Sequence, residues 1–136
     1  MASEGKIKRI FDILRQFTSK TTKETDVNNI FVPTVTLQMF ENLKKIVPNH
    51  SLIMADFDSF LMPRNGIKGL NAPLVSEKIE GAVNHDSYLI PRGHADIYFP
   101  SDFFFLQHAY QEICGKPAQV YKNVEFMEVY ALESWA

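Results

Sequence analysis

Apolar residues recur at helical spacing in three segments of the chain. Residues 7–17 carry an apolar stripe opposite basic and polar side chains, which predicts an N-terminal amphipathic helix. The same spacing over 37–47 predicts a second helix that ends at Pro48. A third helix is expected over 104–113, capped by Ser101 and ended by Gly115.

Extended segments alternate with these helices. Ser51–Ala55 is a nearly unbroken apolar run, which is typical of a parallel strand covered on both faces. Shorter extended stretches and a last short helix from Asn123 are also expected. The stretches are 74–75, 88–90, 95–99 and 119–121. Helix followed by buried strand favours a βαβ layout.

The length of 136 residues and the hydrophobic fraction of 46% predict one domain. Residues 18–29 are polar except for Val27, so we expect them to form a mobile connection after the N-terminal helix. The whole chain, 1–136, is then expected to be a single domain, and residues 18–29 connect the first helix to the rest of it.

Charge and composition exclude several classes of function. A net charge of −2 gives no bulk attraction to nucleic acid or to an anionic membrane. Cys114 is the only cysteine, so neither an internal disulfide nor a cysteine zinc cluster can form, and no apolar run is long enough for a membrane span. Residues 6–18 are basic and amphipathic, but nearby acidic residues make them a poor mitochondrial presequence.

Asp56-Phe57-Asp58 is the most chemically suggestive local pattern, because ligands of open α/β sheets bind beyond strand ends. Phosphatases of the haloacid dehalogenase type use such an Asp-x-Asp pair beside Mg²⁺. They also need a later lysine and a further acidic pair, and the later acids here are scattered singly. The structural alternative is a polar strand end with Phe57 and Phe60 buried.

Other signatures of chemistry are absent from the sequence. The four histidines lack metal-ligand spacing, so we expect no metal. There is no glycine-rich dinucleotide or phosphate loop and no nucleophile elbow. No catalytic residue and no cofactor-binding residue can be assigned.

Several blocks of the chain resemble one family. The segment 92–103, Arg-Gly-His-Ala-Asp-Ile-Tyr-Phe-Pro-Ser-Asp-Phe, looks like a hallmark of MidA-like methyltransferases. The plant and fungal branch of that family has similar blocks in the same order. They correspond to 31–34, 51–57 and 71–76. Residues 124–127 lie where the family has an aromatic-aliphatic pair on its closing helix. The resemblance runs from about residue 4 to the end.

The resemblance implies the later half of a doubly wound α/β domain with a mostly parallel sheet, so the domain is expected to be incomplete. Its mitochondrial members use S-adenosylmethionine (SAM) to methylate an arginine of a complex I subunit during assembly of that complex, which implies the mitochondrial matrix. The family's glycine-rich cofactor loop precedes the matching region. We therefore expect a methyltransferase by family, and no SAM binding by this chain alone.

Arginine methylation requires carboxylates that hold the guanidinium group. Asp56, Asp58 and Asp96 are the candidate substrate-binding residues. Asp102, at a helix start, is better suited to capping.

Two other functions remain open. The chain could be a non-catalytic protein-binding module derived from such an enzyme, with the full-length enzyme or its target as partner. Half of a doubly wound sheet exposes an edge, which predicts self-association. The second alternative is the Mg²⁺-dependent phosphatase.

Overall fold

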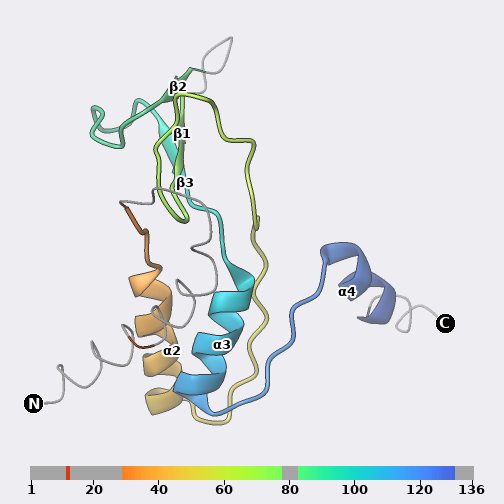
Figure 1. Cartoon of the computed structure of the whole chain (residues 1–136). Coiled ribbons are helices and arrows are strands. Elements are labelled where there is room, and N and C mark those ends of the chain that lie inside the picture. The colour runs from red at the N-terminus through yellow and green to blue at the C-terminus, as the bar shows by residue number, and fades with distance from the viewer. Residues whose placement is uncertain (1–11, 13–28, 78–82, 131–136) are drawn as a thin grey trace, which may run out of the picture.

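The computed structural model describes residues 12, 29–77 and 83–130. Two helices lie side by side, a small sheet lies beyond one end of them, and a third helix stands apart (Figure 1). The helices are α2 (Thr34–Ile46), α3 (Phe103–Cys114) and α4 (Asn123–Tyr130), and the strands are β1 (Leu74–Ser76), β2 (Asn84–His85) and β3 (Asp96–Tyr98). The predicted N-terminal helix and the connection 18–29 lie outside the described residues, apart from Asp12 and Asn29.

The main core lies between α2 and α3. Leu37 and Phe40 point from α2 towards α3, where they meet an apolar stripe with helical spacing. That stripe consists of Phe105, Leu106, Ala109, Tyr110 and Ile113. The sequence predictions of these two helices are therefore confirmed.

Single residues determine where α3 begins and where it ends. The Asp102 side chain accepts a hydrogen bond from the backbone N–H of Phe105 at 3.0 Å, so Asp102, rather than Ser101, is the N-cap. At the other end Gly115 adopts the left-handed conformation, with φ of 69°. A glycine reaches this conformation without the steric cost that a Cβ atom imposes.

The sheet is antiparallel, with strand order β2-β1-β3. Val75, at its centre, pairs with His85 on β2 and with Ile97 on β3. The prediction of a mostly parallel sheet is therefore wrong for the described strands. Only residues 77–83 separate β1 from β2, which allows antiparallel pairing, whereas parallel neighbours need a longer crossover. β3 follows β2 in the chain and pairs antiparallel with the other edge of β1. The described parallel pairing is a single bridge between Ile30 and Leu70.

The predicted buried strand Ser51–Ala55 is also wrong. This segment has no strand partner among the described residues, and 80% of Ile53 is exposed. Only Leu52 packs against the helical core. Two further predicted strands, 88–90 and 119–121, are likewise irregular, whereas those at 74–75 and 95–99 appear as β1 and β3.

Candidate functional site

Asp56 is tied to the residue that precedes the cap of α3. Its Oδ2 accepts a hydrogen bond from the hydroxyl of Ser101 at 2.6 Å. The backbone N–H of Ser101 in turn donates to the carbonyl of Phe57 at 2.9 Å. These two bonds hold the extended segment that carries Asp56 against the start of α3.

Asp58 forms an ion pair with Lys122, which lies just before α4. The Lys122 ammonium group donates a hydrogen bond to Asp58 and, through this bond and its charge, lowers the pKa of that carboxyl. The same contact raises the pKa of Lys122. Both side chains are exposed, 53% for Asp58 and 75% for Lys122, so water and salt screen the pair.

Asp96 joins this region through aromatic side chains. The Tyr98 hydroxyl donates to Oδ2 of Asp96 at 2.9 Å. The ring of Phe60 lies 6.0 Å from that of Tyr98 and 5.9 Å from that of Phe57. The prediction that Phe57 is buried is wrong, because 70% of it is exposed, whereas Phe60 is half-buried.

The structure gives each of the three predicted carboxylates a partner of its own, which is Ser101 for Asp56, Lys122 for Asp58 and Tyr98 for Asp96. Asp56 and Asp58 do not follow a sheet strand; they lie on an exposed segment fixed by residues distant in sequence. Sequence reasoning missed Lys122 and gave Ser101 only a role at a helix start. The hydrogen bond from Lys122 to Asp58 spans 64 positions, and no local pattern in the sequence could have revealed it.

Exposed carboxylates held by neutral donors or by an ammonium group can bind a cationic side chain. Within residues 29–77 and 83–130, no three His, Cys, Asp or Glu residues gather closely enough to hold a metal ion. No helix in the described part of the chain is long and apolar enough to cross a bilayer.

Comparison with known families shows to which family the chain belongs. The model of a family described as "Putative S-adenosyl-L-methionine-dependent methyltransferase" matches residues 2–122. The chain belongs to this methyltransferase family. No curated protein and no solved structure matches the chain.

The described residues of this methyltransferase family member do not fit a SAM site. Such a site needs a glycine-rich turn between a parallel strand and a helix, with backbone N–H groups free to face the ligand. The described connection from strand to helix, between β3 and α3, runs through residues 99–102 and contains no glycine. The space beside Gly69 is filled by Asn29 of the same chain, because a Cβ atom at Gly69 would lie 2.8 Å from the carbonyl oxygen of Asn29.

Proposed function

We propose that this chain supplies the substrate-holding carboxylates of a SAM-dependent methyltransferase, and that the group they hold is a basic side chain. The observation that carries the proposal is the exposed pair of Asp58 and Lys122. In it, a carboxylate of the candidate site already binds a cationic side chain of the same chain. A substrate cation would replace Lys122 on Asp58.

Arginine is the proposed substrate residue, because a guanidinium group can donate to two carboxylates from one plane. Asp56 is suited to be the second acceptor, because its bond to Ser101 fixes its orientation. Asp96, held by Tyr98, borders the same aromatic cluster. These residues bind and orient a substrate; no step of methyl transfer is assigned to them.

The substrate protein and its compartment are proposed from the resemblance to MidA-like methyltransferases. By that likeness the protein substrate is a subunit of respiratory complex I, the setting is the mitochondrial matrix, and the reaction serves assembly of the complex. The support is the series of similar blocks, above all residues 92–103, which contain Asp96 and Ser101.

Binding of an arginine-containing peptide to the 136-residue chain, measured by calorimetry, tests the role of the carboxylates. Asp56→Asn and Asp58→Asn should each weaken binding. Lys122→Ala should strengthen it, because it removes the internal competitor. Asp86→Asn, an equal change of charge at another exposed site, is the matched control. Unchanged binding in both Asp56→Asn and Asp58→Asn would end the proposal.

The absence of a fitting SAM site among the described residues favours a second candidate, a non-catalytic module derived from the same enzyme. Calorimetry with SAM separates the two. Binding of SAM at micromolar concentration supports catalysis by this chain. A folded chain that binds the peptide but does not bind SAM supports the non-catalytic module. The phosphatase gains no support, because the Asp-x-Asp pair follows no strand and no acidic metal cluster surrounds it among the described residues.

A further inference from the structure

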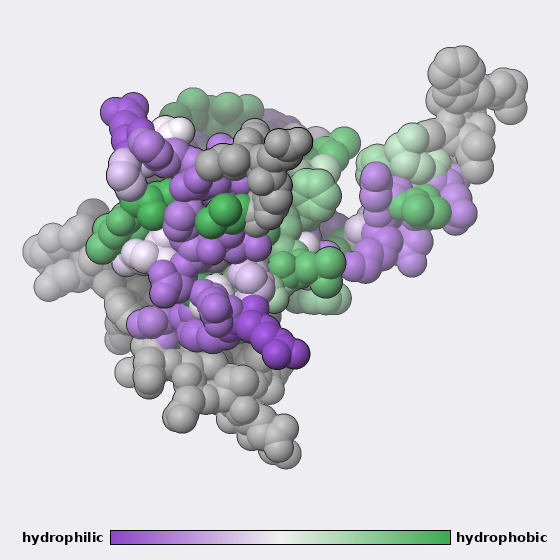
Figure 2. All heavy atoms as spheres, turned by 90° about the horizontal axis from the view of Figure 1, so that it is seen from above, coloured by the Kyte–Doolittle hydropathy of each residue, from purple (hydrophilic) through white to green (hydrophobic). Residues whose placement is uncertain are grey.

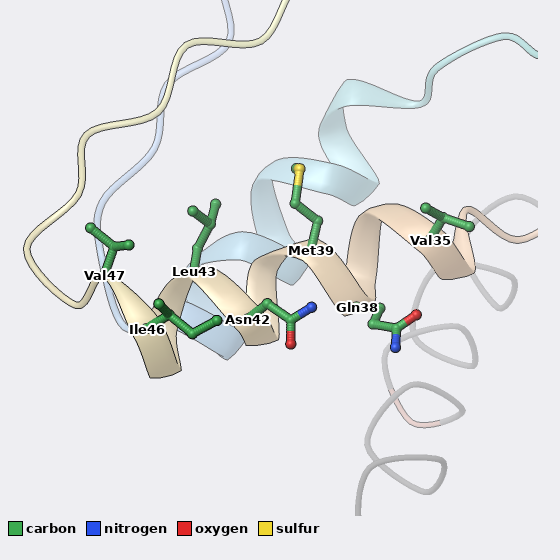
Figure 3. A pocket seen from close by; sticks show the side chains of 7 residues that line it. All are labelled: Val35, Gln38, Met39, Asn42, Leu43, Ile46 and Val47. Carbon is green, nitrogen blue, oxygen red and sulfur yellow. The ribbon is translucent and has the colours of Figure 1, made fainter.

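One face of α2 is an apolar groove that no described residue fills. It is a shallow hollow of about 320 Å³, and its lining repeats at three and four residues along the helix. Figure 3 shows these side chains on the side of α2 that faces away from α3. They are Val35, Gln38, Met39, Asn42, Leu43, Ile46 and Val47. This is the pattern of a surface that receives another helix.

The helix α4 is exposed in a way that matches this groove. It has no buried residue, and it stands apart from α2 and α3 at the end of an extended segment (Figures 1 and 2). Its two aromatic residues, Phe126 and Tyr130, pack against each other, and Phe126 also contacts Tyr121 just before the helix. Val124 and Met127 remain open to solvent. The family match covers residues 2–122, so α4, here called the arm, lies beyond the matched region.

Charge and length make the two surfaces complementary. The arm contains Glu125 and Glu128 and no basic residue, whereas the last turn of α2 contains Lys44 and Lys45. Lys45 lies two turns after Gln38, so it borders the groove. A helix of eight residues is about 12 Å long and fits within the roughly 16 Å between Val35 and Ile46.

We propose that two copies of this chain form a dimer by reciprocal exchange, with α4 of each copy seated antiparallel in the α2 groove of the other. Antiparallel seating places Glu125 beside Lys45 and opposes the dipoles of the two helices. The two contacts are identical, so the assembly closes as a twofold dimer. This contact differs from pairing of sheet edges, and it does not depend on methyl transfer.

Sedimentation of the 136-residue chain over a concentration series tests the proposal. Ile46→Asp in the groove and Met127→Asp in the arm should each raise the Kd of the dimer about tenfold or more. Both side chains are exposed, so the fold should persist, and circular dichroism checks it. Leu61→Asp, at a fully exposed leucine outside both surfaces, is the matched control and should leave the Kd unchanged.

Mixing the two variants identifies the occupant of the groove. A mixed dimer of Ile46→Asp and Met127→Asp keeps one intact contact, so the mixture should dimerise more strongly than either variant alone. Lys45→Glu should weaken the dimer, and adding Glu125→Lys should restore it. A monomer at all concentrations, a dimer insensitive to Ile46→Asp and Met127→Asp, or a mixture no stronger than its components would each overturn the proposal.

Discussion

The phenolic hydroxyl of Tyr110 on α3 donates a hydrogen bond to Nε2 of His50, 60 residues earlier, at 2.9 Å. The other ring nitrogen of His50, Nδ1, lies 2.6 Å from the carbonyl oxygen of Val47, which can only accept. Nδ1–H therefore donates to Val47, and in this tautomer Nε2 accepts from Tyr110. Lys116 completes the contact by donating to the carbonyl of His50 at 2.6 Å. The end of α2 is thus fastened to α3 by polar bonds beside the apolar core.

Tyr110→Phe should lower the free energy of unfolding by about 1 kcal/mol, because it removes the hydroxyl but keeps the packed ring. Urea denaturation measures this loss. In the His50→Ala background, the same Tyr110→Phe change should cost less, since the bond is already broken. An equal cost in both backgrounds would show that the two side chains are not coupled.

Phe105→Ala should destabilise the chain by about 3–5 kcal/mol, because Phe105 is 4% exposed in the core between α2 and α3. Phe104→Ala is the matched control, since the neighbouring ring is 71% exposed. Its cost should be within about 0.5 kcal/mol of zero. Thermal denaturation followed by circular dichroism compares them, and similar losses for both would contradict the packing of α3.

The titration of Asp58 should depend on Lys122. The ion pair lowers the pKa of Asp58 in the folded chain, so the pair stabilises the fold above the carboxyl's ordinary pKa and loses this effect as pH falls through the lowered pKa. Carboxyl NMR of Lys122→Ala should show the pKa of Asp58 rising towards its ordinary value. High salt should produce a smaller rise in the wild-type chain. A pKa that does not respond to Lys122→Ala would contradict the pair.

The thiol of Cys114 should react slowly while the chain is folded. Burial raises its pKa, although Lys44 and Lys116 oppose the effect. The folded state therefore holds less of the reactive thiolate at mildly alkaline pH. Iodoacetamide should alkylate Cys114 more slowly in the folded chain than in urea. This difference in rate should exceed the difference that an unhindered cysteine peptide shows between the same two conditions. Equal rates would contradict the half-buried position against the core.

The sequence by itself determined the helices α2 and α3 and the strands β1 and β3, and it offered Asp102 beside Ser101 as the cap of α3. It also indicated the SAM-dependent methyltransferase family that the match over residues 2–122 shows. Helices and caps are predictable because their hydrogen bonds join residues three or four positions apart, within the reach of a local pattern.

Only the tertiary structure decided the course of Ser51–Ala55, the antiparallel order of the sheet and the partners of the three carboxylates. An apolar run becomes a strand only if another strand offers its backbone groups, and none of the described strands does so for Ser51–Ala55. Asp58 gained Lys122, and Asp56 gained Ser101, because the folded chain brought distant segments together. Long-range contacts depend on how the whole chain packs, which no local pattern of residue types specifies.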